Sequence, residues 1–381
     1  MTGPLVITAG GTGGHMFPAL ALAAELERRG QTVALACDER GARYLPDDKE
    51  AFIVQAASPS GPFAKRWAGM SKLARGFVQS WWWLRKQRPA VVACFGSYAS
   101  VPVGLAAGLL RIPILVHEQN AVLGRANRFV ARRASGLALT FPETRHAEMM
   151  PEDRHVLTGN PVRPEIKTHQ EEAYRLPSEG EPIDVLVIGG SQGARALSDL
   201  LPAAFDRLSG RERSRIRLAQ QCRPEDLERV EQAYKALGFK AELKDFFHDL
   251  PARLAKAHLA ISRAGASSVA EMLVLGKPSV LIPLPSSLEG DQLANAQVVE
   301  AAKAGWLMQE ADLTSEALAD KLRSCLEQPE ELAEMASKAK ALGKPDAAEV
   351  LADAVERMIP GFKSGPKKAN EGRRSDLEAA A

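Results

Sequence analysis

Two glycine-rich turns, one in each half of the chain, constrain the fold more than any other feature. The first turn, residues 10–14, follows an apolar run at residues 5–9, and the second, residues 189–193, follows an apolar run at residues 183–188. Each turn precedes a helical pattern, so each half opens with a strand, a glycine loop and a helix. This repeated unit predicts an α/β protein with two Rossmann-like domains that face each other across a cleft, each with a parallel sheet covered on both faces.

The length of the chain also favours two domains, because 381 residues exceed what one hydrophobic core comfortably holds. We place the first domain at residues 1–163 and the second at residues 164–345, since a proline-flanked turn and a polar stretch lie between them. A helix at about residues 346–359 is expected to pack back on the first domain. The basic tail at residues 361–381 is expected to be disordered.

The cysteines and the amino-terminal sequence favour a cytoplasmic protein. The four cysteines are far apart and fit neither a metal site nor a disulfide framework. The apolar run at residues 5–9 is too short for a secretion signal. An uncharged stretch at residues 89–110 is as long as a membrane span, but its Gly and Pro residues favour a strand, a loop and a short helix.

The stretch at residues 259–296 predicts half of a ligand site. A helix is expected to begin near Ser267, and its first-turn N–H groups would favour an anion such as a phosphate. Glu271 lies one turn further on and is better suited to accept hydrogen bonds from sugar hydroxyls. A second strand then leads to a polar loop with Gln292 and Asn295 at the edge where such sheets bind ligands. The alternative is an ordinary strand–helix–strand unit with a glycine-rich connection.

His15 ends the first glycine loop and is a candidate general base, because an imidazole titrates near neutrality. The alternative is a histidine that caps the helix or faces solvent. Polar turns at Tyr98 and at His117 and Glu118 follow two other strands and are expected to line the same cleft. Glu118 is the weaker candidate base.

A segment at residues 63–88 predicts a helix with a basic face. Apolar residues recur every three or four positions on one face, which we expect to pack on the core. The opposite face carries Lys65, Lys72, Arg75, Trp83 and Lys86. No Asp or Glu occurs between Glu50 and Glu118, although eight Lys or Arg do. This pattern is typical of contact with an anionic membrane surface. A solvated helix face is the alternative, and nucleic acid is less favoured because no recognised motif accompanies the charge.

Six motifs occur along the chain in a specific order: Gly-Gly-Thr-Gly-Gly-His, Gly-Ser-Tyr, His-Glu-Gln-Asn, Gly-Asn-Pro-Val-Arg, Gly-Gly-Ser-Gln-Gly-Ala and Ser-Arg-Ala-Gly-Ala-Ser-Ser-Val-Ala-Glu. Over residues 3–358 the chain resembles the MurG family of bacterial peptidoglycan glycosyltransferases. The resemblance implies the GT-B fold and inverting transfer of N-acetylglucosamine from UDP-GlcNAc to the 4-hydroxyl of the MurNAc of lipid I, which gives lipid II. It implies neither a cofactor nor a metal site. It also implies a peripheral position on the cytoplasmic side of the bacterial inner membrane, with other cell-wall synthesis proteins as partners.

The resemblance assigns site residues by position. The donor-binding set is Thr12, Gly13, Gly14, Asn120, Arg163, Ser191, Phe247, Ala266, Ser267, Ser268, Val269, Ala270, Glu271 and Gln292. Within it, Arg163 and Ser191 would hold the diphosphate, Glu271 would bind the ribose, and Gln292 would bind the transferred sugar. Asp291 stands where members of the family can have a glutamine, so its contact with the sugar is left open.

The residues leave other activities open. A GT-B enzyme that acts on another lipid, such as a diacylglycerol glycosyltransferase, would share the donor half and the basic helix. A UDP-N-acetylglucosamine 2-epimerase would share the fold and the donor but need no acceptor. A non-catalytic nucleotide-sugar-binding protein would bind UDP without releasing it from a sugar.

Overall fold

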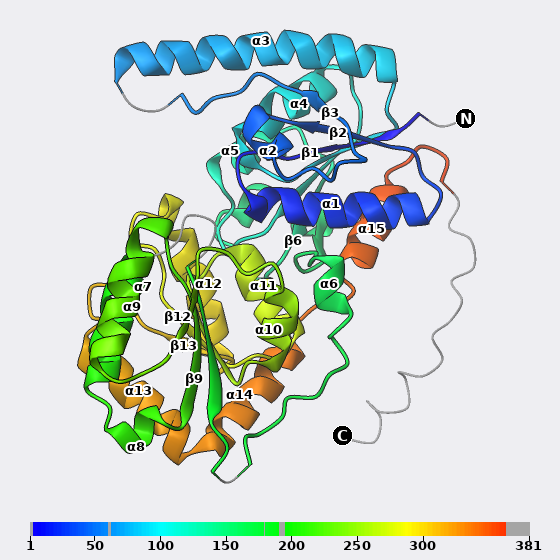
Figure 1. Ribbon diagram of the computed structural model, residues 1–381. Helices are drawn as coiled ribbons and strands as arrows, with labels where there is room; N and C mark the ends of the chain where they lie inside the picture. The colour runs from blue at the N-terminus through cyan, green and yellow to red at the C-terminus, as the bar shows by residue number, and fades with distance from the viewer. Residues whose placement is uncertain (1–2, 60–61, 179, 190–194, 363–381) are drawn as a thin grey trace, which may run out of the picture.

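The computed structural model describes residues 3–59, 62–178, 180–189 and 195–362, and it shows two α/β domains, one above the other in Figure 1. The predicted diphosphate ligand Ser191 and nearly all of the tail predicted to be disordered lie outside these residues.

The first domain is built on a seven-stranded sheet with the order β3-β2-β1-β4-β5-β6-β7, in which every pair of neighbouring strands is parallel. Its strands are β1 (Leu5–Thr8), β2 (Val33–Cys37), β3 (Ala51–Ile53), β4 (Val91–Cys94), β5 (Ile114–Glu118), β6 (Gly136–Leu139) and β7 (His155–Leu157). Its helices are α1 (Gly13–Arg28), α2 (Glu39–Ala42), α3 (Phe63–Gln87), α4 (Ser97–Leu109) and α5 (Arg125–Ala131), with short 3-10 turns η1 (Ala147–Met149) and η2 (Glu152–Arg154).

The second domain has a six-stranded parallel sheet with the order β10-β9-β8-β11-β12-β13. Its strands are β8 (Ile183–Ile188), β9 (Ile216–Gln221), β10 (Glu242–Lys244), β11 (Leu259–Ser262), β12 (Ser279–Leu281) and β13 (Trp306–Leu307). The helices from α6 onward are α6 (Pro164–Lys167), α7 (Arg195–Asp206), α8 (Gly210–Arg213), α9 (Leu227–Ala236), α10 (Leu250–Lys256), α11 (Ala266–Val274), α12 (Asp291–Ala301), α13 (Ser315–Glu327), α14 (Pro329–Leu342) and α15 (Ala347–Arg357), with 3-10 turns η3 (Pro224–Asp226) and η4 (Leu288–Gly290). Each sheet is covered on both faces, so the predicted fold class is confirmed.

The last helix, α15, returns to the first domain and packs against α1 (Figure 1). Its apolar residues Leu351 and Val355 belong to the same buried cluster as Leu22 of α1. Arg29, at the end of α1, donates hydrogen bonds to Glu356 of α15 at 2.8 Å. The chain therefore crosses between the domains twice, once before β8 and once before α15.

Helix α3 differs from its prediction in which apolar residues it buries. Phe63 is 76% exposed and Trp67 59% exposed, so the prediction that the whole apolar face packs on the core is wrong for the amino-terminal half. Only the second half lies against α4, as Figure 1 shows. Trp83, predicted to face outward with the basic residues, stacks instead on Phe52 with ring centroids 4.6 Å apart.

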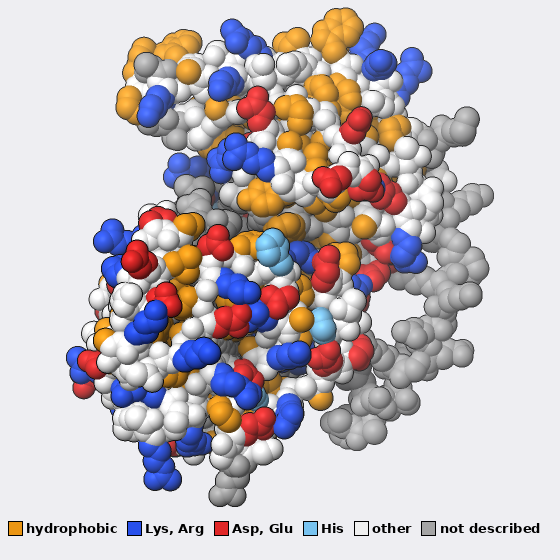
Figure 2. Space-filling view, in the orientation of Figure 1, with side chains coloured by type: hydrophobic (Ala, Val, Ile, Leu, Met, Phe, Trp, Pro, Cys, Tyr) orange, Lys and Arg blue, Asp and Glu red, His pale blue; other side chains and the backbone are white. Residues whose placement is uncertain are grey.

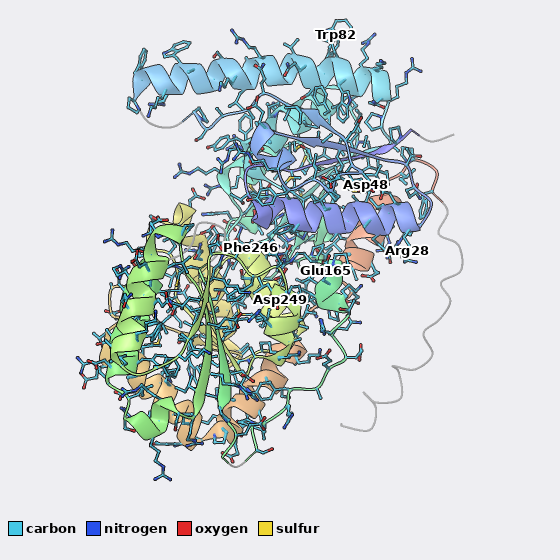
Figure 3. The ribbon with its side chains drawn as sticks, in the orientation of Figure 1. Arg28, Asp48, Trp82, Glu165, Phe246 and Asp249 are labelled. Carbon is cyan, nitrogen blue, oxygen red and sulfur yellow. The ribbon has the colours of Figure 1, made fainter. Side chains whose placement is uncertain are left out.

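The outward tryptophan in the second half of α3 is Trp82, which is 63% exposed and points away from the domain in Figure 3. Figure 2 shows basic and apolar side chains together along this outer side of the helix. None of the helices in the described ranges has the length and apolar character needed to cross a bilayer.

Helix α1 begins earlier than the sequence predicts. The glycine pattern predicts a loop that ends at His15, but the helix begins at Gly13 and includes Pro18 within its second turn. A proline there costs one backbone hydrogen bond, because it has no N–H to donate to the carbonyl of Gly14. Because α1 begins at Gly13, His15 lies in the first turn of a helix rather than in a loop.

Candidate active site

The amino-terminal ends of two helices, one from each domain, meet at the boundary between the domains. Helix α1 begins at Gly13 and α11 at Ala266, and neither receives a side-chain hydrogen bond from its N-cap residue. The hydroxyl of Ser267 donates to the carbonyl oxygen of Gly14 at 3.4 Å, the carbonyl that Pro18 leaves without a helical donor. First-turn N–H groups of both helices therefore lie near one another, which suits an anionic group such as a diphosphate.

Asp38 holds the first glycine loop in place. Its Oδ1 accepts hydrogen bonds from the backbone N–H groups of Gly11 at 2.9 Å and Gly41 at 2.8 Å. Gly11 has a φ of +78°, which side-chain-bearing residues rarely adopt. A Cβ atom at Gly10 would lie only 2.6 Å from the Cβ of Ala99. The glycines thus allow β1 to turn into α1 close against α4.

Arg163 and Glu271, predicted to bind the diphosphate and the ribose, are bound to each other. Nε and Nη2 of Arg163 donate to the two carboxylate oxygens of Glu271 at 2.7 and 2.8 Å. The guanidinium carbon also lies 5.3 Å from the ring centroid of Phe17 in α1. Glu271 is 5% exposed, so Arg163 compensates a charge that would be costly to bury alone. A bound diphosphate would compete with Glu271 for this guanidinium.

Glu118 organises the loop after β5. Its carboxylate accepts four hydrogen bonds, from the backbone N–H groups of Asn120 at 3.0 Å and Gly124 at 2.9 Å and from the side-chain amides of Asn120 at 3.1 Å and Asn127 at 2.8 Å. The residue is 2% exposed. Because its oxygens are occupied and shielded from solvent, we discard Glu118 as an alternative base.

Asn120, one of the predicted donor-binding residues, connects the two domains. Its Oδ1 accepts a hydrogen bond from Nδ2 of Asn295 in α12 at 3.0 Å. The buried Asn295 also donates to the carbonyl oxygen of Ala264 and accepts from the N–H of Ala121. Sequence reasoning placed Asn295 in a polar loop but missed this bridge, because the contact depends on how the domains pack.

His15 is connected to two buried side chains by a row of hydrogen bonds. Nδ1 of His15 lies 3.0 Å from Oε1 of Gln119, and Nε2 of Gln119 lies 3.0 Å from Nδ1 of His117. Nε2 of His117 lies 3.0 Å from the carbonyl oxygen of Gly159. Since His117 is 1% exposed and packs against the ring of Phe95, the prediction that it lines the cleft is wrong. Gln119, which the prediction omitted, is the residue that contacts His15.

The burial of His117 predicts a specific loss of stability in acid. Burial lowers the pKa of His117 from 6.5 to about 4 in the folded protein. Between these values the unfolded chain binds a proton at this residue that the folded protein excludes. The contribution of neutral His117 to the free energy of unfolding is therefore complete above pH 6.5. As the pH falls towards 4, the free energy of unfolding decreases by up to about 3 kcal/mol.

Urea unfolding of the wild type and of His117→Phe at about pH 7.5 and pH 5 measures this loss. We expect the free energy of unfolding to fall more between the two pH values in the wild type than in the variant, which has no group to titrate there. Equal falls in the two proteins would contradict a neutral, buried His117.

The loop between β12 and α12 brings Asp291 and Gln292 to the same boundary. Oε1 of Gln292 accepts a hydrogen bond from the N–H of Leu284 at 3.0 Å, and Oδ1 of Asp291 accepts one from the N–H of Gln292 at 2.7 Å. Burial raises the pKa of Asp291, and electrostatic attraction to His15 opposes this rise. Asp291 therefore lies within electrostatic reach of the candidate base, across the boundary from it.

The other predicted residues are spread over the two domains. Ala266, Ser267 and Ser268 form the first turn of α11, followed by the buried Val269 and Ala270. Phe247 is buried beneath the guanidinium of Arg253, 4.6 Å from its ring centroid. Tyr98 is partly buried against the core of the first domain. Among the described residues, no group of three or more His, Cys, Asp or Glu could hold a metal ion.

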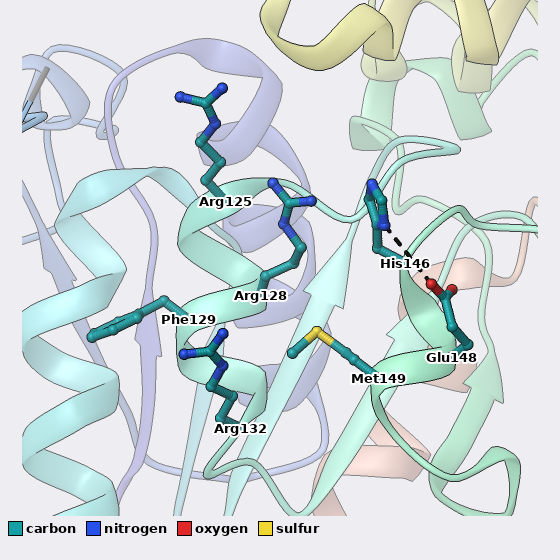
Figure 4. Close-up of a pocket in the computed structure, with 7 residues that line it drawn as sticks. All are labelled: Arg125, Arg128, Phe129, Arg132, His146, Glu148 and Met149. Atoms are coloured by element: carbon teal, nitrogen blue, oxygen red, sulfur yellow. Dashed lines mark ion pairs between the residues drawn. The ribbon is translucent and has the colours of Figure 1, made fainter.

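A cavity of about 440 Å³ opens on the first domain beside α5 and η1 (Figure 4). Its lining residues are Arg125, Arg128, Phe129, Arg132, His146, Glu148 and Met149. Arg125 and Arg128 are already paired with Glu289 of η4, at 2.8 and 2.5 Å. These ion pairs form a further link between the two domains.

The two domains match the two family models of one class of enzyme. Residues 5–138 match the glycosyltransferase family 28 N-terminal domain, and residues 184–351 match the glycosyltransferase family 28 C-terminal domain. Two parallel-sheet domains joined in this way form the GT-B fold. The fold and the site therefore define a GT-B glycosyltransferase of family 28.

Relatives narrow this class. The chain is 48% identical to the UDP-N-acetylglucosamine–N-acetylmuramyl-(pentapeptide) pyrophosphoryl-undecaprenol N-acetylglucosamine transferase of Paramagnetospirillum magneticum, over 94% of this chain and 97% of that protein. It is 45% identical to the protein of the same name from Rhodospirillum centenum, over 92% and 93% of the two chains. The crystal structure of Acinetobacter baumannii MurG superposes with a TM-score of 0.75 at 30% identity, over 93% of this chain and 99% of that one. The chain belongs to the MurG family.

A UDP-GlcNAc 2-epimerase from Neisseria meningitidis also superposes, with a TM-score of 0.66 at 14% identity, over 93% of this chain and all of that one. At this identity the likeness shows a shared fold alone.

Proposed function

We propose that this enzyme transfers N-acetylglucosamine from UDP-GlcNAc to the 4-hydroxyl of the MurNAc residue of lipid I, giving lipid II with inversion at the anomeric carbon. The observation that carries the proposal is the meeting of two uncapped helix N-termini, from α1 and α11, with His15 in the first turn of one of them. The names of the relatives support the choice of substrates.

In the proposed reaction the acceptor oxygen attacks the anomeric carbon from the face opposite the diphosphate. The bond between that carbon and the diphosphate oxygen breaks, and UDP leaves with its electron pair. The hydroxyl proton passes to His15, which is the candidate base. The N–H groups that begin α11 and the guanidinium of Arg163 stabilise the charge that develops on the leaving diphosphate.

We assign the donor to the second domain and the acceptor to the first. Glu271 and Gln292 would meet the ribose and the transferred sugar from the second domain, and Thr12, Gly13 and Gly14 would approach the diphosphate from the first. The interdomain contacts of Asn120 and Asn295 hold the two halves of the site together.

UDP release measured with and without a short-chain lipid I analogue tests the proposal. A transferase releases UDP only when the acceptor is present. Conversion of UDP-GlcNAc without an acceptor would point to the epimerase reaction, and binding without any release would point to a non-catalytic protein. Release with diacylglycerol but not with the lipid I analogue would move the acceptor to another lipid.

We further propose that α3 binds the cytoplasmic face of an anionic membrane, where a polyprenyl-linked acceptor must remain. The exposed Phe63, Trp67 and Met70 lie on the same helix as Lys65 and Lys72. Apolar side chains next to basic ones are suited to insertion among anionic lipid headgroups.

Charge reversal on α3 is expected to abolish this binding. In Lys65→Glu/Lys72→Glu/Arg75→Glu, we expect partition onto anionic vesicles to fall by at least roughly 100-fold, because each basic residue near such a surface contributes about 1 kcal/mol. Sedimentation with vesicles measures the partition. The matched control reverses Arg211, Lys240 and Lys256, which are exposed on the second domain. Equal sedimentation of the α3 variant and the control would rule out this surface.

A further inference from the structure

The hydrogen bonds that reach His15 have a direction, which two backbone carbonyls determine. A carbonyl oxygen can only accept a hydrogen bond. Nε2 of His117 lies 3.0 Å from the carbonyl oxygen of Gly159, so this nitrogen carries a hydrogen atom. Nε2 of Gln119 lies 3.2 Å from the carbonyl oxygen of His117, so the amide nitrogen, and not the amide oxygen, lies on that side.

The direction then passes from His117 to His15. A neutral His117 that is protonated on Nε2 has a lone pair on Nδ1, and it accepts a hydrogen bond from Nε2 of Gln119 at 3.0 Å. The amide oxygen of Gln119 therefore faces His15. Because an amide oxygen can only accept, Nδ1 of His15 must donate across the 3.0 Å that separate them.

From this geometry we propose that Gln119, supported by His117, is a positioning residue that holds neutral His15 in the tautomer protonated on Nδ1. The lone pair of Nε2 is then the one that takes the proton of the attacking hydroxyl. This inference rests on the proposed function, in which His15 is the base. No side chain among the described residues hydrogen bonds to Nε2 of His15, so this nitrogen is accessible to the hydroxyl group of the acceptor substrate.

Burial keeps the row of hydrogen bonds intact. Gln119 and His117 are each 1% exposed, so water does not compete for their polar atoms. The lowered pKa of His117, caused by burial, keeps its Nδ1 an acceptor at neutral pH. Asp291, on the second domain, is a charged side chain within electrostatic reach of His15. Gln119 is neutral, so it sets the tautomer of His15 without placing a buried negative charge beside it.

Nitrogen NMR on protein labelled with ¹⁵N-histidine tests the inference, because the ring nitrogen that carries hydrogen and the one that does not have distinct chemical shifts. The chain has seven histidines, and the spectrum of His15→Ala identifies the signals of His15. In wild-type protein whose His15 is neutral, we expect hydrogen on Nδ1 and none on Nε2.

Two substitutions at Gln119 separate positioning from packing. Gln119→Met keeps the length of the side chain but removes the acceptor, so hydrogen should move to Nε2 in part of the molecules. We expect kcat to fall roughly three- to tenfold, the effect of one ordinary hydrogen bond, with an unchanged KM for UDP-GlcNAc. Gln119→Glu keeps an oxygen facing His15 and should retain the Nδ1-protonated tautomer.

Gln31→Met is the matched control, since Gln31 is an amide of the same domain whose hydrogen bond goes to Glu356. It should leave both the tautomer and kcat unchanged. Hydrogen on Nε2 of His15 in an active wild type, or hydrogen that stays wholly on Nδ1 of His15 in Gln119→Met, would overturn the positioning role. Absence of acceptor-dependent turnover in the wild type would overturn the proposed function itself, and the NMR spectrum distinguishes the two failures because it needs no turnover.

Discussion

His15→Gln lowers kcat by about 10²- to 10⁴-fold and leaves the KM for UDP-GlcNAc nearly unchanged, if His15 is the general base. At position 15, in the first turn of α1, glutamine keeps an N–H group that can donate to Gln119, but it cannot take a proton. The donor is held mainly by the second domain in our proposal, so its binding should survive. Steady-state kinetics with a soluble lipid I analogue measure both constants.

The control for this substitution is His169→Gln, which changes a half-buried histidine paired with Glu172, far from the site, and should leave kcat unchanged. Near-wild-type turnover in His15→Gln, with the same dependence on pH, would remove His15 from the mechanism. The hydrogen-bond chain through Gln119 would then have only a structural role.

Arg163→Met is expected to abolish donor binding and to destabilise the protein by about 2–5 kcal/mol. The two effects have separate causes. Donor binding is lost because no guanidinium remains to hold the diphosphate. Stability is lost because Glu271, bidentate to Arg163 and 5% exposed, becomes a buried carboxylate without its cation.

The double variant Arg163→Met/Glu271→Met separates these causes. Without the unpaired charge, the double variant should regain most of the lost stability in thermal or urea unfolding. It should still fail to bind UDP-GlcNAc in calorimetry. Donor binding by the double variant would show that Arg163 supports the fold and does not contact the donor.

The sequence predicts the sheets and the start of α11 well, because both depend on local patterns. Alternating apolar runs and helical patterns specify parallel strands, and glycines mark the turn that follows β1. The helix N-terminus at Ala266 follows from small residues after β11, and the structure begins α11 within one residue of the predicted Ser267.

Other features depend on packing that no local pattern records. Periodicity predicts Trp83 on the outer face of α3, but Phe52, on the strand that precedes this helix, offers it a stacking partner. The polarity of His117 suggested a cleft residue, whereas its hydrogen bond to Gly159 satisfies it in the interior. The contact between Asn120 and Asn295 joins positions 175 residues apart across the domain boundary.

The most direct test of the central claim is the NMR structure of the glycosidic linkage in the product formed from UDP-GlcNAc and a lipid I analogue. We predict N-acetylglucosamine joined to the 4-hydroxyl of MurNAc with the β configuration, the inverse of the α-linked donor. An α linkage would contradict direct attack from the face opposite UDP, and attachment at another hydroxyl would contradict the proposed acceptor position.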